Sequence, residues 1–162
     1  MFPLFSKKAR AGAAIHLLRI NHCSECERLH ATAFAKPWKA PEFERLFLAS
    51  TTVAEGAFVG SQPKLAGFAI SRLVLDEAEI LTITVDQQHR RSGIARSLLS
   101  AHIGRISGLG GQKIFLEVDE HNSAAIGLYM GFGFYGVGKR ASYYQLPNGE
   151  AADALIFRLD LT

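Results

Sequence analysis

A basic, glycine-containing turn is the part of the sequence best suited to bind a charged ligand. It covers Val85 to Arg96 (VDQQHRRSGIAR), where a strand-like apolar run gives way to helical spacing. A helix N-terminus leaves N–H groups without helical acceptors and carries partial positive charge, so it binds phosphate well. Gly93 lets a ligand approach the backbone, while Arg90, Arg91 and Arg96 add positive charge. The turn therefore favours a phosphate-bearing ligand, and the alternative is an ordinary strand–helix connection with solvated arginines.

Two widespread nucleotide-binding patterns do not occur in this turn. The sequence has neither the loop pattern G-x-x-x-x-G-K-[ST] nor the dinucleotide pattern G-x-G-x-x-G at this place. A phosphate-bearing cofactor of another class is therefore expected.

Two polar side chains stand in apolar surroundings further along the chain. Glu117 lies between Leu116 and Val118 in an apolar run, so we expect it to be ion-paired, at a sheet edge, or functional. Tyr129 follows Asn122 by two helical turns, which places both residues on one helix face. Tyr129 suits proton donation, and the alternative is a core tyrosine whose hydroxyl is hydrogen-bonded. Asn122 is of a type that caps helices.

The spacing Cys23-x-x-Cys26 also occurs in redox and metal sites. His22 and His30 lie in the same amphipathic segment, but no second cysteine pair follows in the sequence. We therefore expect two ordinary thiols on a helix and no metal site.

Strands and helices must position these side chains. Apolar runs predict strands, and 3.6-residue spacing predicts helices, with Pro37 ending the first helix and Pro41 opening the second. The last two strands of this half are expected to form an antiparallel hairpin. The expected elements are a strand over Ala13–Ile20, helices over Ser24–Phe34 and from Pro41 onward, and strands over Thr52–Val59, Leu65–Leu75 and Ala78–Val85.

The second half of the chain begins with a longer helix, which a glycine-rich segment after Ser107 ends. A turn-prone Pro147-Asn148-Gly149 precedes the last strand. The expected elements are a helix over Ser92–Ser107, a strand over Lys113–Val118, a helix over Asn122–Met130, and strands over Phe132–Gly138 and Asp153–Leu161. The sequence thus predicts a single mixed α/β domain over residues 1–162, with a flexible tail at residues 1–12.

Length and composition agree with one globular domain. A chain of 162 residues can bury its own core, and 48% hydrophobic with 20% charged residues is ordinary for a globular protein. The net charge of +3 is modest, and we find no basic stripe that would suit a nucleic acid. Residues 1–14 do not resemble a signal peptide, and no apolar run approaches the length of a membrane span. We expect a cytoplasmic protein without membrane or direct nucleic-acid contacts.

Two motifs, in the expected order, resemble the GNAT superfamily of N-acetyltransferases. Arg90-x-x-Gly93-x-Ala95 matches the pattern R/Q-x-x-G-x-G/A, whose turn holds the pyrophosphate of coenzyme A in that family. Residues 122–134 are similar to the pattern N-x-x-A-x-x-L-Y-x-x-x-G-F. The resemblance implies the GNAT fold, a mixed and mostly antiparallel sheet of about seven strands with about four flanking helices. It also implies acetyl-coenzyme A as the cofactor.

The same resemblance implies roles for individual residues. Glu117 would act as the base, through a water, and Tyr129 as the acid that protonates the departing thiolate. An α-amine titrates near pH ~8, so a modest base suffices. In such enzymes the strand before the turn pairs with the pantetheine arm. The implied cofactor-binding residues are Ile83, Thr84, Val85, Arg90, Arg91, Ser92, Gly93, Ile94, Ala95, Arg96, Asn122 and Tyr129.

From about Ile15 to Leu161 the chain resembles the RimI-type ribosomal-protein N-terminal alanine acetyltransferases. The likeness rests on residues 29–38, 65–85 and 116–134, and on Arg140-x-x-Tyr143-Tyr144 near the peptide cleft. That family follows its tyrosine pair directly with proline, whereas Gln145 and Leu146 intervene here. The implied substrate is a protein N-terminal α-amine, that of an alanine in a small-subunit ribosomal protein. The implied substrate-binding residues are Trp38, Glu117, Tyr143 and Tyr144, although Trp38 fits a packing role equally well.

Two alternative functions stay open. The first is acetylation of a small-molecule amine, because GNAT motifs report the cofactor better than the acceptor. The second is a non-catalytic coenzyme A-binding interaction module on the same fold. Glu117 and Tyr129 argue against the second alternative, because a binding module needs neither. We expect a monomer or a weak homodimer.

Overall fold

The computed structural model describes residues 12–161, so the expected tail lies outside the described residues except for Gly12. The described chain forms seven strands, hydrogen-bonded in the order β1-β2-β3-β4-β5-β7-β6, and four α-helices. Both numbers agree with the expected fold class. The elements are β1 (Ala14–Leu17), η1 (Ile20–His22), α1 (Cys23–Ala33), α2 (Ala40–Leu48), β2 (Thr52–Val59), β3 (Lys64–Val74), β4 (Glu77–Val85), η2 (Gln87–His89), α3 (Ile94–Gly108), β5 (Lys113–Asp119), α4 (Ser123–Gly131), β6 (Tyr135–Gln145) and β7 (Ala151–Asp160).

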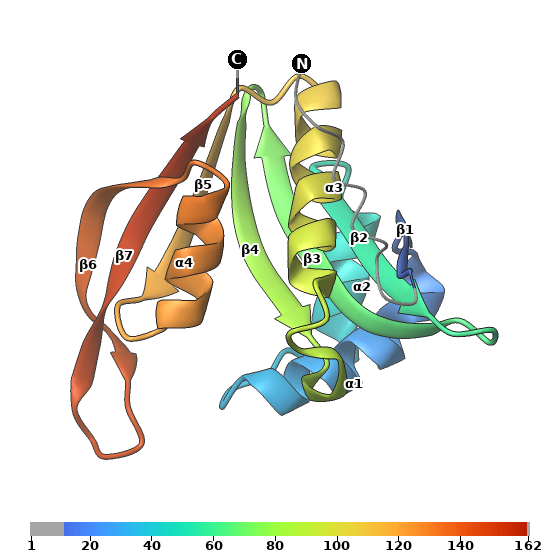
Figure 1. The fold of residues 1–162 in the computed structure, drawn as a ribbon, viewed down its shortest axis with the longest axis horizontal. Coiled ribbons are helices and arrows are strands. Elements are labelled where there is room, and N and C mark those ends of the chain that lie inside the picture. Colours follow the sequence, from blue (N-terminus) through green and yellow to red (C-terminus); the bar gives the residue numbers. More distant parts are fainter. Residues whose placement is uncertain (1–11, 162) are drawn as a thin grey trace. The chain divides into compact units, whose positions relative to one another are not determined.

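The described residues group into two compact units. The first unit contains residues 12–70 and 82–104, and the second contains residues 71–81 and 105–161. In the first unit, α3 lies on one side of the strands, and α1 and α2 lie on the other (Figure 1). β1 pairs antiparallel with β2, from Ala14 opposite Phe58 to Leu17 opposite Glu55.

Aromatic and aliphatic packing holds the helices of the first unit on its strands. Phe43 of α2 is fully buried and meets Phe68 of β3 edge-on, with 5.7 Å between the ring centroids. On α3, Ile94 and Leu98 pack in a cluster with small residues of β2 and β3. Alanines at Ala57, Ala66 and Ala69 therefore let the start of α3 lie close to the strands.

In the second unit, β5 pairs parallel with β4 and antiparallel with β7. The β5–β7 ladder runs from Lys113 opposite Asp160 to Asp119 opposite Ala154. Ile114, Leu116 and Val118 are buried, while the residues between them are only half-buried, so β5 has one core face and one accessible face. This is the alternation expected around Glu117.

The C-terminal strands are longer than the sequence predicts. The strand expected at Phe132–Gly138 begins only at Tyr135, because Phe134 still belongs to the turn after α4 and donates its N–H to the Tyr129 carbonyl at 3.1 Å. It then continues to Gln145 and forms a long hairpin with β7. The length of β6 depends on its pairing with β7, which the residue pattern of β6 alone does not reveal.

Candidate active site

Short polar residues fix the chain where β4 ends, in the first unit. The Asp86 carboxylate accepts a hydrogen bond from the Gln88 N–H at 3.0 Å and so caps η2. The Ser92 hydroxyl donates to the His89 carbonyl. The turn that sequence reasoning singled out is therefore locally ordered.

Backbone N–H groups and exposed arginines come together at the start of α3. Gly93 has a φ of +85° and Arg91 a φ of +59°, so the chain passes through the left-handed region just before the helix. The Ser97 N–H donates to the Gly93 carbonyl at 3.0 Å and so makes the first hydrogen bond of the helix. The N–H groups before Ser97, in the first turn, therefore have no acceptor within the helix. A Cβ on Gly93 would meet no protein atom within 4 Å. The backbone is thus open to a ligand, as a phosphate site requires.

The side chains around this turn divide into exposed polar and buried apolar ones. Ile94 is buried against Leu98, and Ala95 is half-buried. The remaining predicted phosphate-binding side chains, Arg90, Arg91, Ser92 and Arg96, are exposed. The apolar residues anchor the turn, and the cationic side chains are accessible to an anion.

The end of β4 carries the predicted backbone positions for the cofactor. Ile83 and Val85 are half-buried and pack against the cluster at the start of α3, while Thr84 is buried. Sequence reasoning misses Gly67 of β3, where a Cβ would lie only 2.9 Å from the Thr84 carbonyl oxygen. A glycine inside a strand pattern is the signal that could have found it.

Pairing between β4 and β5 is short. The registered pairs run from Glu77 opposite Lys113 to Glu79 opposite Phe115, and within residues 12–161 this ladder extends no further. Ile80 and Leu81, the next β4 residues of this unit, are therefore outside the parallel ladder.

Glu117 is ion-paired in the second unit. Arg140 Nη1 donates to both carboxylate oxygens, at 3.3 Å to Oε1 and 3.2 Å to Oε2, and the Glu117 side chain is 29% exposed. The Arg140 guanidinium also lies 4.0 Å from the centroid of the Tyr143 ring. Of the three expectations for Glu117, pairing is confirmed. Arg140 is a site residue that sequence reasoning saw only as part of a motif.

Tyr129 is held in its protonated form. Burial, with a smaller contribution from the neighbouring Tyr144, raises the pKa of its hydroxyl to about 12. Its ring also contacts Phe134 edge-on, at 5.6 Å between centroids. At neutral pH the phenol therefore keeps a proton that it can donate.

Tyr143 and Tyr144 lie beside these two residues. Their rings meet edge-on at 5.0 Å. Burial raises the pKa of Tyr144, and Tyr143, Glu117 and Asp119 raise it further, whereas Arg140 lowers it. The structure thus brings Glu117, Tyr129, Arg140, Tyr143 and Tyr144 together in one unit.

Asn122 caps α4, as expected, because its side-chain oxygen accepts from the Ala125 N–H at 3.2 Å. Trp38 belongs to the first unit and takes part in packing. Its ring stacks on His30 at 4.8 Å between centroids, and its backbone N–H donates to His30 Nδ1 at 3.0 Å. For Trp38 the packing alternative is observed.

The two cysteines behave as ordinary buried thiols. Cys26 is fully buried, and burial raises its pKa to about 12, with Cys23 and Glu25 adding to the shift. Burial also raises the pKa of Cys23. Among the described residues no group of three or more metal-ligating side chains could hold an ion. These thiols are therefore poor nucleophiles at neutral pH.

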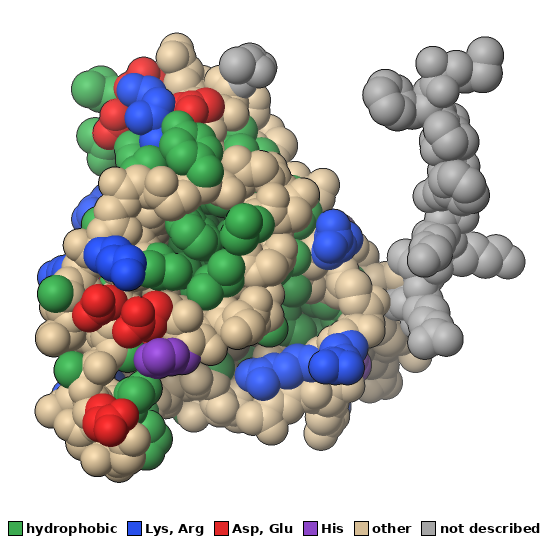
Figure 2. All heavy atoms as spheres, turned by 60° about the vertical axis from the view of Figure 1, so that its left-hand side comes forward, with side chains coloured by type: hydrophobic (Ala, Val, Ile, Leu, Met, Phe, Trp, Pro, Cys, Tyr) green, Lys and Arg blue, Asp and Glu red, His purple; other side chains and the backbone are tan. Residues whose placement is uncertain are grey.

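Side chains of both signs occur on the face that Figure 2 shows. No helix in residues 12–161 is long and apolar enough to cross a membrane.

Comparison with known proteins identifies relatives over most of the chain. Residues 23–134 match the acetyltransferase (GNAT) family. A ribosomal protein bS18-alanine N-acetyltransferase of Escherichia coli K12 is 39% identical over 99 residues, which are 61% of this chain and 66% of the relative. The chain is thus aligned with about two thirds of the length of this curated relative. The protein of the same name from Haemophilus ducreyi is 35% identical over 100 residues, which are 62% of this chain and 69% of the relative.

Solved structures share the fold over nearly the whole chain. The ribosomal-protein-S18-alanine N-acetyltransferase from Escherichia coli superimposes with a TM-score of 0.85 and 31% identity, covering 93% of this chain and 94% of that one. Arabidopsis thaliana NAA60 in complex with acetyl-CoA has a TM-score of 0.82 and 22% identity, over 92% of this chain and 98% of that one. The second likeness shows the fold alone.

Proposed function

The chain belongs to the acetyltransferase (GNAT) family, and from this premise we propose that it moves the acetyl group of acetyl-coenzyme A to the N-terminal α-amine of a protein. The proposed acceptor begins with alanine and is a small-subunit ribosomal protein, as the names of its relatives suggest. One observation carries the proposal. Within one unit, the Glu117 carboxylate and the Tyr129 phenol both lie near Tyr144, and a pKa of about 12 keeps the phenol protonated.

The start of α3 fits the pyrophosphate of the cofactor. Gly93 is open where a Cβ would stand, the first-turn N–H groups have no helical acceptor, and exposed arginines surround them. We assign cofactor binding to the turn from Arg90 to Arg96, to the main chain of Ile83, Thr84 and Val85, and to Asn122 and Tyr129. Acetyl-coenzyme A supplies an activated thioester carbonyl to the site.

Glu117 and Tyr129 manage the protons in this proposal. Glu117 takes the proton of the attacking α-amine through a water, which its oxygens can accept because each retains a lone pair beyond its bond to Arg140. The Tyr129 hydroxyl gives its proton to the departing sulfur. Arg140 orients the carboxylate, since one guanidinium nitrogen bonds both of its oxygens.

Tyr143 and Tyr144 are assigned to the acceptor chain. Tyr143 is exposed, lies under the Arg140 guanidinium and stands next to the β6–β7 loop. Trp38 contributes by fixing the segment between α1 and α2 through its contacts with His30. We further propose that the whole chain acts as one catalytic domain in the cytoplasm, as a monomer or weak homodimer without direct nucleic-acid contact.

The deciding experiment is release of free thiol from acetyl-coenzyme A with short peptides that begin with Ala, Ser, Met or Lys. Mass spectrometry locates the added acetyl group. Acetylation confined to the α-amine of alanine or serine supports the proposal. Binding of acetyl-coenzyme A without turnover of any peptide would overturn it and redirect the search to small-molecule amines or to a binding module.

A further inference from the structure

A bulge interrupts β6 in the second unit, close to the proposed base. The registered pairs on either side of it are Arg140 with Ala154 and Tyr144 with Ala152. Residues 141–143 of β6 therefore face a single residue of β7, Asp153. Ser142, in the middle of the bulge, has a φ of +54°. This backbone conformation is costly for a residue with a Cβ, so contacts around the bulge must hold it in place.

The Asp153 carboxylate makes such a contact. Its Oδ1 accepts a hydrogen bond from the Ser142 N–H at 2.9 Å. The backbone of Asp153 is fixed at the end of β5, since its N–H donates to Glu120 Oε1 at 3.0 Å and its carbonyl accepts from the Glu120 N–H at 3.0 Å. A half-buried side chain thus gives the bulge a hydrogen bond, and the residue that carries it is itself fixed to the strand of Glu117.

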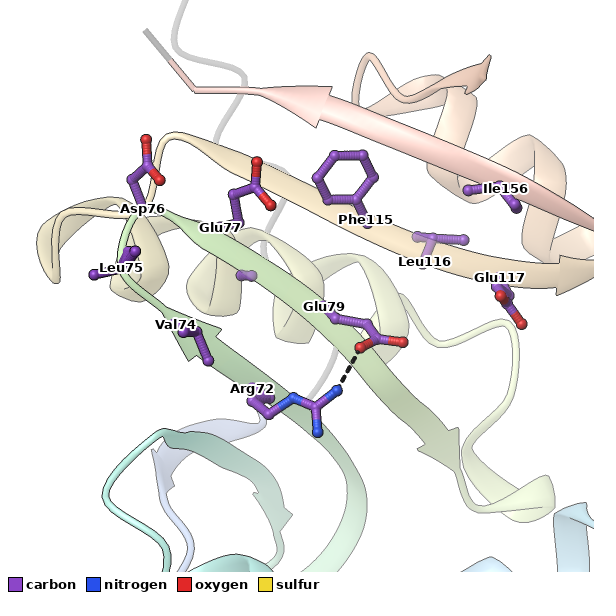
Figure 3. A pocket seen from close by; sticks show the side chains of 11 residues that line it. Arg72, Val74, Leu75, Asp76, Glu77, Glu79, Phe115, Leu116, Glu117 and Ile156 are labelled. Carbon is purple, nitrogen blue, oxygen red and sulfur yellow. Dashed lines mark hydrogen bonds and ion pairs between the residues drawn. The ribbon is translucent and has the colours of Figure 1, made fainter. Parts of the chain in front are cut away.

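The bulge determines which side chains of β6 meet Glu117. Glu117 lies on β5 opposite Ile156 of β7, as Figure 3 shows, and β6 is the next strand beyond β7. Arg140 reaches across β7 and bonds both oxygens of Glu117, and its guanidinium lies 4.0 Å from the centroid of the Tyr143 ring. On a regular strand, side chains three residues apart point to opposite faces. The contact between Arg140 and Tyr143 therefore requires the bulge.

We propose that Asp153 is a positioning residue, whose carboxylate holds the bulge at Ser142 and through it keeps Arg140 on the Glu117 carboxylate. Asp153 takes no part in proton transfer and acts only through Arg140. This inference rests on the proposed function and adds to it the contact that orients the base.

The test compares three replacements of Asp153 in the full chain, with a peptide that begins with alanine as the acceptor. Asp153→Asn removes the charge but keeps an acceptor oxygen in place, so its kcat should stay within about threefold of wild type. Asp153→Glu keeps the charge but moves the oxygens by the length of a methylene group, and Asp153→Ala removes them. Both should lower kcat about tenfold, while the KM for acetyl-coenzyme A stays within about twofold. If Asp153→Ala does not fold, the comparison of asparagine with glutamate carries the test.

A double variant tests whether Asp153 acts through Arg140. Arg140→Ala alone should lower kcat, because the Glu117 carboxylate loses the guanidinium that orients it. Adding Asp153→Ala or Asp153→Glu should then lower kcat by less than about twofold more, since no guanidinium remains for the bulge to place.

Asp160→Ala is the matched control. Asp160 is another carboxylate of β7 that bonds β6, since it accepts from the Tyr135 hydroxyl at 2.7 Å. Its loss weakens the same hairpin, but kcat should stay within about twofold of wild type. Thermal unfolding of all variants gives the Tm against which the changes in kcat are compared.

The outcomes distinguish the two proposals. An Asp153→Glu variant as fast as wild type, or an Asp153→Asn variant as slow as Asp153→Glu, overturns the positioning role and leaves the proposed function intact, because peptides are still acetylated. Independent, multiplicative effects of the Asp153 and Arg140 replacements overturn it too, as does an equal loss of kcat in Asp160→Ala. Failure of the wild-type protein to acetylate any peptide overturns the proposed function and this inference with it.

Discussion

At the scale of single residues, the chemistry depends on what surrounds Glu117. Arg140 bonds both of its oxygens, which orients the carboxylate while leaving lone pairs for a water or an amine. The pair is partly exposed, so its contribution to folding is small, about 0–1 kcal/mol. Its importance lies in orientation, and changes here should affect kinetics more than stability.

Replacing Glu117 with glutamine should lower kcat/KM about 100-fold at pH 7, because the acceptor amine is then mostly protonated and no base assists it. The loss should shrink by pH 9, since an α-amine with a pKa of ~8 becomes neutral there. A pH profile of thiol release measures this. An equal loss at every pH would contradict the role of base.

Replacing Tyr129 with phenylalanine should lower kcat about 100-fold while acetyl-coenzyme A affinity stays within twofold, as general-acid catalysis typically requires. Because burial raises the pKa of this hydroxyl to about 12, the wild-type rate should show no loss from its ionisation up to pH ~10. Tyr135→Phe is the control, since the Tyr135 hydroxyl bonds Asp160 at 2.7 Å and has no proposed role. An unchanged kcat for Tyr129→Phe would remove the proton-donor assignment.

At the scale of elements, local signals were enough for the strand–turn–helix around Gly93. Its boundaries depend on spacing, capping and positive φ, which are all properties of neighbouring residues. The contact between Glu117 and Arg140 joins residues 23 positions apart, and it follows from the length of β6. The close approach of Gly67 to β4 is likewise a tertiary property, so the sequence shows a glycine there without showing its reason.

Two glycine-to-alanine changes should separate ligand binding from stability. At Gly93 the positive φ makes alanine cost about 1 kcal/mol of folding free energy, and acetyl-coenzyme A should bind at least about tenfold more weakly, because the new methyl group enters the open space. At Gly104, inside α3, alanine should gain about 0.5–1 kcal/mol and leave binding unchanged. Calorimetric titration and urea unfolding give both quantities. Equal affinities in the two variants would exclude the α3 site.

The aromatic cluster between α1 and α2 should make stability sensitive to acid. Burial lowers the pKa of His30 to about 4, although Glu42 opposes the shift. The stability from a neutral His30 is thus complete above the unfolded pKa of ~6.5 and lost as the pH falls towards 4.

Urea unfolding should therefore show that the free energy of unfolding falls by about 2 kcal/mol between pH 7.5 and pH 5 because of His30. His30→Gln keeps a neutral side chain able to accept from the Trp38 N–H, so it should lack this part of the pH dependence. The same pH dependence in the variant would show that another group titrates.

At the scale of the whole molecule, the sequence predicts one domain, whereas the described residues group into two compact units. Strands β3 and β4 contribute to both units, so neither is a continuous stretch of chain. Length and composition predict one domain, and the shared strands agree with this because no linker separates the two units. The acceptor substrate cannot be predicted from length and composition. In the function proposed here, the acceptor is chosen by side chains such as Tyr143, which a long hairpin positions.

Differential scanning calorimetry should show one unfolding transition, because the interleaved chain leaves no half able to unfold alone. Acetyl-coenzyme A at 100 times its Kd should stabilise the whole transition by about 3 kcal/mol. Two transitions, of which the ligand shifts one, would contradict the single-domain prediction.

The two outermost strands also determine how the sheet meets other copies of itself. β1 has only four residues, and β6 is exposed along nearly its whole length but is interrupted by register shifts next to Gly136 and Arg140. Ser142 adds a φ of +54°, and Lys139 places a further charge on the strand. Irregular, charged edges are poor templates for cross-β growth. The β6–β7 hairpin can therefore stay exposed without serving as a starting point for aggregation.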